Sequence, residues 1–238
     1  MSDQTTTDTL AIKAIEEIRS GMAVGLGAGR TAARGIRALA EKVRLTGLDI
    51  RCVGASDSSD ALGRELGLNI VDFATMETLD VLIDGADEVD RDLRVMKGSR
   101  GAITRERMLA WASKHTVYMV TADKVSDKIG TKSTLAVAVM YFGLASTRAE
   151  IRRLGLNGVV RRDLNNEPFL TDNGNLILDI TLEGDEALDD IASQLNDIPG
   201  VIAHGLFTRE ADTIMIEHEN GEIEVVERPP HEDSAGAG

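Results

Sequence analysis

Short apolar runs alternate with longer stretches of helical periodicity through the first 121 residues of this chain. The apolar runs, which have the length of buried strands, lie at 22–25, 50–54, 70–73, 81–83 and 117–121. The stretches with helical spacing lie at 10–19, 31–43, 58–66 and 104–112. Strands that alternate with helices favour a mostly parallel sheet with helices on both faces, because each parallel connection needs a crossover. We therefore predict an α/β fold built on such a sheet.

The pattern changes after Gly130, where short strands begin to outnumber helices. We expect strands at 135–141, 159–162, 169–171 and 176–181, helices at 147–154 and 186–196, and final strands at 201–207, 213–217 and 223–227. The Asp172-Asn173-Gly174-Asn175 sequence is typical of a turn between antiparallel strands. These features predict a second, smaller α+β domain.

The domain boundaries follow from these elements. Residues 1–130 and 206–228 are predicted to form the larger domain, and residues 131–205 the smaller one. Residues 229–238 are rich in proline, glycine and acids, which predicts a flexible tail.

Composition and charge exclude several classes of protein. A hydrophobic content of 42% is too high for a disordered chain, and no run approaches the roughly 18 apolar residues of a membrane span. The N-terminus lacks the basic start and apolar region of a signal peptide, so we expect a cytoplasmic protein. The net charge of −14 opposes binding to nucleic acid or to an anionic membrane. An anionic substrate must therefore be held by a local positive pocket.

Cysteine and histidine offer no metal site. Cys52 is the single cysteine and lies in an apolar run, which predicts a buried structural thiol and excludes an intrachain disulfide. The histidines show no ligand spacing with one another or with Cys52, so no metal is expected. Trp111 falls on the apolar side of its helical pattern and is predicted to lie in the core.

The segment from Asp80 to Glu106 concentrates acids, a lysine and glycines around the end of one expected strand. Asp84 and Asp87 follow the apolar run, Lys97 begins a glycine-containing turn, and Glu106 begins a helix. Ligands of open α/β sheets bind at the carboxyl ends of strands. Aldose–ketose interconversion needs a base and donors that stabilise an enediolate, which carboxylates and a lysine provide without a metal. A solvated acidic loop in which Glu106 caps a helix is the competing interpretation.

A glycine loop, from Gly25 to Thr31, separates the first strand from its helix. Glycines let the backbone approach a phosphate, and a helix N-terminus offers free amides. Arg30 stands where a dinucleotide-binding motif requires its third glycine, so that motif fails. Asp57, after the second strand, keeps a nucleotide site open as an alternative, and a tight turn without a ligand is another.

Lysines cluster after the last parallel strand of the first region. Lys124 stands closest to the strand end, and Lys128 and Lys132 follow within nine residues. Solvated surface charges are the alternative to a substrate contact for each of them.

Together these motifs are similar to those of one enzyme family, in order along nearly the whole chain. They are the glycine loop, Ala55-Ser56 with Ser59, the acids at 84–88, the stretch from Lys97 to Glu106, Lys124, the turn at 171–175 and the Ile198–Val201 sequence. The combination resembles the ribose-5-phosphate isomerase type A family.

The resemblance implies an isomerase without a cofactor that interconverts D-ribose 5-phosphate and D-ribulose 5-phosphate in the non-oxidative pentose phosphate pathway. It also implies a Rossmann-like catalytic domain beside the smaller α+β domain, and assembly into a homodimer or homotetramer. By position, Glu106 is the base that moves a proton between C1 and C2. Asp84 assists opening of the sugar ring, and Asp87 and Lys97 bind the sugar oxygens. The implied substrate-binding residues, with the glycine loop at the phosphate, are Gly27, Ala28, Gly29, Arg30, Thr31, Ser56, Gly85, Ala86, Gly98, Ser99, Arg100 and Lys124.

Some positions depart from the family's pattern. Ala28 and Arg30 replace a threonine and a serine of the glycine loop, and Ser99 and Arg100 interrupt a glycine run. Arginine can grip a phosphate bidentately and so compensate for lost hydroxyls. These changes leave open an isomerase of a different phosphorylated sugar. A non-catalytic sugar-phosphate sensor is the alternative from another class.

Overall fold

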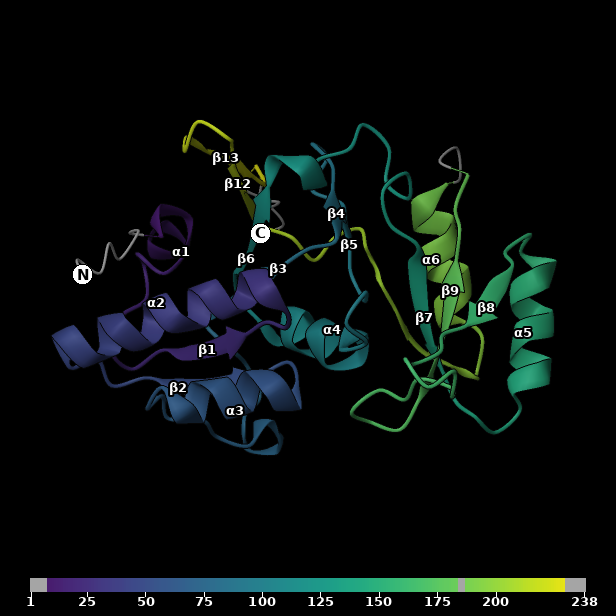
Figure 1. Cartoon of the computed structure of the whole chain (residues 1–238), viewed down its shortest axis with the longest axis horizontal. Coiled ribbons are helices and arrows are strands. Elements are labelled where there is room, and N and C mark those ends of the chain that lie inside the picture. The colour runs from purple at the N-terminus through teal and green to yellow at the C-terminus, as the bar shows by residue number, and fades with distance from the viewer. Residues whose placement is uncertain (1–7, 184–186, 230–238) are drawn as a thin grey trace, which may run out of the picture.

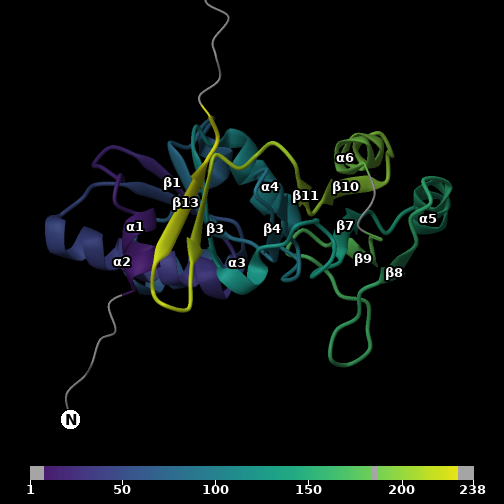
Figure 2. The same ribbon diagram turned by 90° about the horizontal axis from the view of Figure 1, so that it is seen from above.

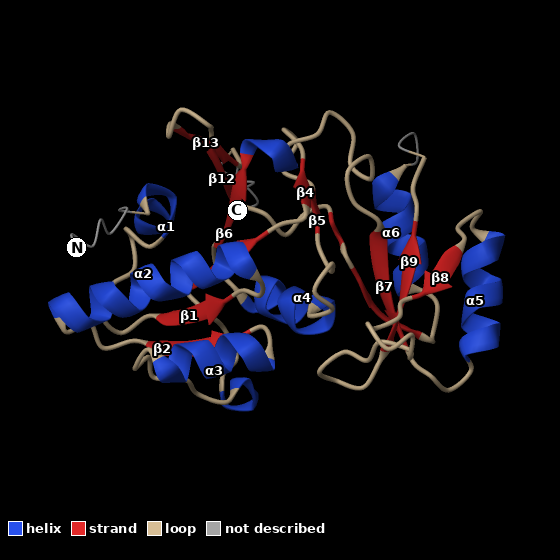
Figure 3. Ribbon diagram, in the orientation of Figure 1, coloured by secondary structure: helices blue, strands red, loops and turns tan. Residues whose placement is uncertain are grey.

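The computed structural model describes residues 8–183 and 187–229, and within them the strands form sheets of six, four and three strands. The six-stranded sheet has the order β13-β12-β6-β3-β1-β2. Figure 3 shows β13 and β12 at one side of it and β1 and β2 at the other. Its strands are β1 (Ala23–Leu26), β2 (Arg51–Gly54), β3 (Val81–Gly85), β6 (Thr116–Thr121), β12 (Thr213–Glu217) and β13 (Ile223–Glu227). All neighbouring pairs are parallel except β12 with β13 at the edge. The mostly parallel sheet predicted from the sequence is therefore confirmed.

Helices cover both faces of this sheet. Successive side chains of a strand point to opposite faces, so apolar strands present apolar surface on each face that a helix must cover. The helices are α1 (Thr9–Ala14), α2 (Arg30–Thr46), α3 (Asp57–Glu65) and α4 (Ile103–Ala112). Ile83 of β3 packs in one cluster with residues of α1 and α2, such as Leu39. Its neighbour Leu82 packs in another cluster with Leu109 of α4. This alternation is why the sheet strands read as continuous apolar runs.

The four-stranded sheet is antiparallel and has the order β10-β7-β9-β8. Its strands are β7 (Leu135–Val139), β8 (Gly158–Val160), β9 (Leu176–Ile180) and β10 (Val201–His204), and its helices are α5 (Leu144–Arg153) and α6 (Leu188–Asn196). Figures 1 and 2 show it at one end of the molecule, beside the six-stranded sheet. Ile103 of α4 packs against Ala136 and Ile177, so α4 lies between the two sheets. We propose that residues 1–130 and 206–228 form one domain and residues 131–205 the other.

A three-stranded antiparallel sheet lies between the two larger ones. It consists of β4 (Glu88–Val89), β5 (Val95–Met96) and β11 (Leu206–Phe207) in the order β11-β5-β4. This small sheet was not predicted from the sequence, because its strands are too short to show a pattern. Its strands β4 and β5 form the segment that connects the end of β3 to Lys97.

Three predicted strands need correction. At 70–73 only Ile70 forms a bridge, to Cys52, because the Asp72 side chain caps a 3-10 turn at Phe73–Thr75. At 169–171 a single bridge forms between Leu170 and Leu176. The run 201–207 divides between two sheets at Gly205, where a Cβ would lie 2.0 Å from the Lys97 carbonyl oxygen.

Trp111 was also predicted wrongly. Its side chain is 86% exposed, because α4 directs Ile103, Leu109 and Ala110 into the core and Trp111 lies beyond them. Cys52 is buried and free, as expected, and burial raises the pKa of its thiol to about 12. Of the predicted flexible tail, residues 230–238 lie outside the described part of the chain. No helix among the described residues is long and apolar enough to cross a membrane.

Candidate active site

Lys97 lies between two buried carboxylates that come from different elements. Its Nζ is 2.9 Å from Oδ2 of Asp84, at the end of β3, and 3.1 Å from Oε1 of Glu106, in the first turn of α4. The ammonium also donates to the backbone carbonyl of Gly85 and faces the ring of Tyr118 at 5.6 Å. Two oxygens that the sequence separates by 22 residues thus share one cation.

The glycine loop holds the side chain of Asp84 in place. Its Oδ1 accepts hydrogen bonds from the backbone amides of Gly85 at 2.7 Å and Ala28 at 3.1 Å. A Cβ at Gly27 would lie 2.0 Å from that oxygen, so only glycine leaves room for the carboxylate. The glycine loop therefore positions the Asp84 carboxylate, in addition to any contact it makes with a ligand.

The charges of this trio do not balance, because one ammonium faces two carboxylates. Burial raises the pKa of Glu106 to about 7, the Lys97 charge opposes this shift, and the Asp84 charge adds to it. Burial likewise raises the pKa of Asp84, against the attraction of Lys97. Burial alone would lower the pKa of Lys97, but the two carboxylates raise it, so the lysine stays an ammonium. Glu106 can therefore accept and release a proton near neutral pH.

Glu106 also has an oxygen free for chemistry. Its Oε2 is buried and has no hydrogen-bond partner among the described residues. Buried carboxylate oxygens are normally satisfied, so an unpartnered one beside a pocket is a candidate base.

Glu106 and Lys97 face a pocket of about 290 Å³, which is at the lower end of the size of small-molecule sites. The pocket is lined by Ala28, Gly29, Arg30, Thr31, Gly85, Ala86, Asp87, Lys97, Gly98, Ser99, Arg100, Glu106, Lys124, Lys132 and Ser133. Gly29, which lines the pocket, is the N-cap residue of α2; its φ is +94°, and no side-chain hydrogen bond caps the helix. The free amides of this N-terminus, with Arg30, Arg100, Lys124 and Lys132, suit a phosphate.

Asp87 is held by the turn that follows Lys97. The Ser99 amide donates to Oδ2 of Asp87 at 2.9 Å, and the Ser99 hydroxyl donates to Oδ1. Arg161, which follows β8 of the four-stranded sheet, supports this turn, since it donates to the carbonyl oxygens of Gly98 at 2.8 Å and Ser99 at 3.1 Å. The four-stranded sheet and the six-stranded sheet therefore both shape the pocket wall.

Glu88 holds the wall that carries Lys132. It is fully buried and accepts hydrogen bonds from the amides of Gly130, Thr131 and Ser133 and from the hydroxyls of the last two. These bonds measure 3.0–3.1 Å. A buried carboxylate thus fixes the loop 130–133.

Comparison with known proteins identifies the family. A model of the ribose 5-phosphate isomerase A (phosphoriboisomerase A) family matches residues 51–221. The chain is 40% identical over 206 residues to the ribose-5-phosphate isomerase A of Sphingopyxis alaskensis, covering 87% of this chain and 89% of that protein. It is 41% identical over 208 residues to that of Sinorhizobium medicae, covering 85% and 89%. This chain belongs to the ribose-5-phosphate isomerase A family.

Solved structures of the family share the fold. Ribose 5-phosphate isomerase A from Methanocaldococcus jannaschii matches with a TM-score of 0.86 and 27% identity, over 92% of this chain and 96% of that one. A D-ribose-5-phosphate isomerase in complex with phospho-erythronic acid matches with a TM-score of 0.87 and 31% identity, over the same shares. The family and the α/β fold predicted from the sequence are confirmed.

Most residues that the resemblance implies for this isomerase family meet at the pocket, and a few do not. Asp84 and Gly27 lie behind its wall, where they contact each other. Ser56 is the N-cap of α3 and its hydroxyl contacts Ser58 and Ser59 at 2.9 and 2.8 Å, outside the lining. Asp57 pairs with Arg105 at 2.6 Å, also away from the pocket, so it does not support a nucleotide site. Ala28, Arg30, Ser99 and Arg100, which depart from the family's pattern, all line the pocket.

Three residues around the site were not predicted from the sequence. The Tyr118 ring faces Lys97, Ser133 lines the pocket, and Glu88 holds the loop 130–133. Glu88 had a signal, since it continues the acidic run from Asp84, but its partners come more than 40 residues later. No group of histidine, cysteine, aspartate and glutamate suited to a metal occurs among the residues described.

Proposed function

We propose that this chain interconverts D-ribose 5-phosphate and D-ribulose 5-phosphate, with Glu106 as the base that transfers the proton. The observation that carries the proposal is the buried Glu106 carboxylate beside Lys97, with its pKa raised to about 7. A base with a pKa near the working pH transfers protons most efficiently. Membership of the isomerase family supplies the reaction class.

The proton moves between adjacent carbons of the open-chain sugar. The ionised Glu106 removes the proton from C2 of the aldose, and that electron pair forms a C1–C2 double bond while the C1 carbonyl becomes an enediolate oxygen. Lys97 stabilises the negative charge on this oxygen as it develops. Glu106 then returns the proton to C1, the O2 proton passes to O1, and O2 becomes the ketose carbonyl. No atom is gained or lost.

The remaining acids have supporting roles in this proposal. Asp84, which lies behind the pocket wall, keeps Lys97 charged and assists opening of the furanose ring through Lys97. Asp87, held by Ser99, accepts hydrogen bonds from sugar hydroxyls. The amides at the start of α2 and the side chains of Arg30, Thr31, Arg100 and Lys124 bind the phosphate, which lies at the opposite end of the substrate from C1.

Turnover of Glu106→Gln tests the base. The variant keeps the size of the side chain and loses the proton acceptor, so we expect kcat for ribose 5-phosphate to fall by about 100-fold or more. The assay uses chelator-treated enzyme without added metal. Glu65→Gln, an exposed glutamate at the end of α3, is the matched control and should turn over normally. Near-normal turnover by Glu106→Gln would remove Glu106 as the base.

Isomerisation of a different phosphorylated sugar is the second candidate, because Arg30 and Arg100 line the pocket where hydroxyl or glycine residues are usual. Comparison of kcat/KM across aldose phosphates separates the two candidates. Tight binding of ribose 5-phosphate without turnover by the unmodified chain would favour a sugar-phosphate sensor instead. Assembly into a homodimer or homotetramer and a cytoplasmic location stay predictions.

A further inference from the structure

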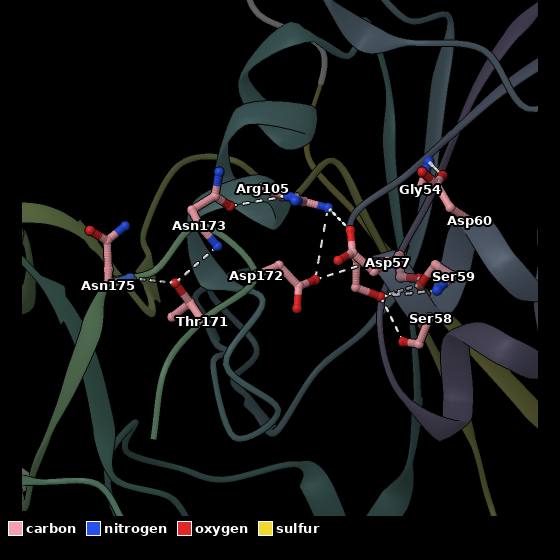
Figure 4. A network of polar contacts seen from close by, with 12 residues as sticks. Gly54, Asp57, Ser58, Ser59, Asp60, Arg105, Thr171, Asp172, Asn173 and Asn175 are labelled. Atoms are coloured by element: carbon pink, nitrogen blue, oxygen red, sulfur yellow. Dashed lines mark hydrogen bonds and ion pairs between the residues drawn. The ribbon is translucent and has the colours of Figure 1, made fainter. Parts of the chain in front are cut away.

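Arg105 is the neighbour of Glu106 on α4, and its guanidinium joins two segments that are distant in the sequence. Its Nη1 donates to Oδ1 of Asp57 at 2.6 Å, and its Nε donates to Oδ1 of Asn173 at 3.0 Å. Figure 4 shows Arg105 between these groups. The Asp57 amide, at the start of α3, also donates to Oδ2 of Asp172 at 2.9 Å. Helices α3 and α4 and the turn 171–175 thus meet at one point.

The turn 171–175 is shaped for this contact. Thr171 is buried, and its hydroxyl oxygen accepts the backbone amides of Asn173 at 3.3 Å and Asn175 at 3.1 Å. The turn therefore folds around its own threonine. The side chains of Asp172 and Asn173 are left to point at α3 and α4 (Figure 4).

Helix α3 continues the connection to the glycine loop. The Ser59 hydroxyl donates to the Gly27 carbonyl oxygen at 2.7 Å, and the Ser59 amide donates to the hydroxyl of its cap, Ser56, at 3.0 Å. The glycine loop and α4 are therefore linked twice. The inner link runs through Asp84 and Lys97 to Glu106, and the outer link runs through α3 to Arg105.

We propose that Arg105, Asp57 and the turn 171–175 form a brace that sets the distance between the glycine loop and Glu106. The proposal rests on the function proposed above, since it takes the glycine loop as the phosphate site and Glu106 as the base. A sugar held by its phosphate presents C1 and C2 to the base only if this distance is kept. Misplacement of reacting groups by about 1 Å can cost roughly 100-fold in rate. Arg105 is thus a positioning residue, which touches no substrate.

The ion pair of the brace is partly exposed, which separates its effect on rate from any effect on stability. The Asp57 side chain is 73% exposed and that of Arg105 is 29% exposed. Ion pairs so open to solvent add little to the free energy of unfolding. Removal of the brace should therefore lower turnover while the protein stays folded.

The test measures kcat, KM and Tm for Arg105→Met, Asp57→Ala and the double variant, with ribose 5-phosphate as substrate. Each single variant should lower kcat about tenfold, change KM less than kcat, and shift Tm by no more than about 3 °C. The double variant should be no slower than the slower single variant, because both remove the same link. Asp57→Ala removes the acceptor of Arg105 at a side chain that is 73% exposed, so it serves even if Arg105→Met folds poorly.

Arg44→Met is the matched control, since it removes another exposed ion pair, with Glu41 on α2. It should leave kcat unchanged. A kcat within twofold of the parent in both single variants overturns the brace, as does a double variant that loses the product of the two single effects. If kcat falls in Glu106→Gln but is normal in Arg105→Met, the brace alone is rejected. If Glu106→Gln keeps its kcat, Glu106 is rejected as the base, and the proposed function on which the brace depends is rejected with it.

Discussion

One ammonium between two buried carboxylates determines the chemistry of the site at the scale of single residues. Lys97 can neutralise the charge of Asp84 or of Glu106, but not of both. Asp84 has two backbone amides as further donors, and the second oxygen of Glu106 has no partner among the described residues. The proton is therefore best placed on Glu106, whose pKa lies near 7.

This pKa predicts the pH dependence of the reaction. The base must be ionised in the free enzyme, so kcat/KM should fall as the pH drops through about 7, by about tenfold per unit well below it. Initial rates between pH 5 and pH 9 with ribose 5-phosphate would show this limb. A profile that stays flat down to pH 5 would mean that the group acting as base has an ordinary carboxyl pKa.

Gly27 predicts a second effect at this scale. In Gly27→Ala the new Cβ would collide with Oδ1 of Asp84, so the carboxylate must move from its position beside Lys97. We expect kcat to fall by about 100-fold and the free energy of unfolding to fall by about 1–3 kcal/mol. Steady-state kinetics and urea unfolding measure the two effects.

Gly47→Ala is the control for the Gly27 variant. Gly47 has a φ of +69° and no atom within 4 Å of the added Cβ, so it strains the backbone without crowding. It should lose stability and keep its kcat. Equal kcat for the two variants would show that Asp84 tolerates displacement.

At the scale of elements, loops rather than helices complete the pocket, and buried groups hold the loops. Loop 130–133 has no strand or helix of its own, yet it places Lys132 and Ser133 at the pocket. Glu88 on β4 replaces the missing backbone partners of this loop. The short sheet of β4, β5 and β11 thus positions both Lys97, which follows β5, and the loop 130–133, which Glu88 of β4 holds.

Glu88→Gln tests this role. The amide keeps the size of the side chain but turns an NH2 group toward backbone donors that need an acceptor, so the loop should move. We expect KM for ribose 5-phosphate to rise about tenfold, equivalent to about 1.4 kcal/mol, while kcat changes less. Steady-state kinetics beside the Glu65→Gln control measure this. A drop in kcat with an unchanged KM would place Glu88 with the base instead of with the substrate-binding wall.

At the scale of the whole molecule, the pocket attracts an anion against the field of the protein. The net charge is −14, while Arg30, Arg100, Lys124 and Lys132 gather at one pocket. Long-range repulsion is screened by salt before short-range contacts are, because the Debye length is about 30 Å at 0.01 M and about 8 Å at 0.15 M.

The ionic strength should therefore affect catalysis in an unusual direction. We expect kcat/KM for ribose 5-phosphate to rise by about twofold as NaCl goes from about 10 mM to about 150 mM, because screening relieves the repulsion of the substrate. Initial rates at low substrate concentration measure it. A steady fall over the same range would mean that the pocket cations already dominate the field at long distance.

Periodicity in the sequence was enough to predict most strands and helices, because burial on both faces of a parallel sheet leaves continuous apolar runs. It failed where a side chain overrides the pattern. Asp72 turns the chain at 70–73, Thr171 gathers the amides of the 171–175 turn, and Gly205 passes the chain between two sheets. Trp111 was misplaced because a helical pattern cannot tell which of its flanks a neighbouring element will cover.

The order of motifs along the chain determined the family, the fold class and most residues of the pocket, since these depend on residue type and strand ends. Three features could not be read from that order: the contact of Asp84 with Gly27, the sharing of Lys97 by two acids, and the link from Arg105 to Asp57 and the turn 171–175. Each depends on distances between residues that lie from 9 positions apart, as Lys97 and Glu106 do, to 115 apart, as Asp57 and Asp172 do. Burial, which raises the pKa of Glu106, is likewise a property of packed neighbours and not of the residue itself.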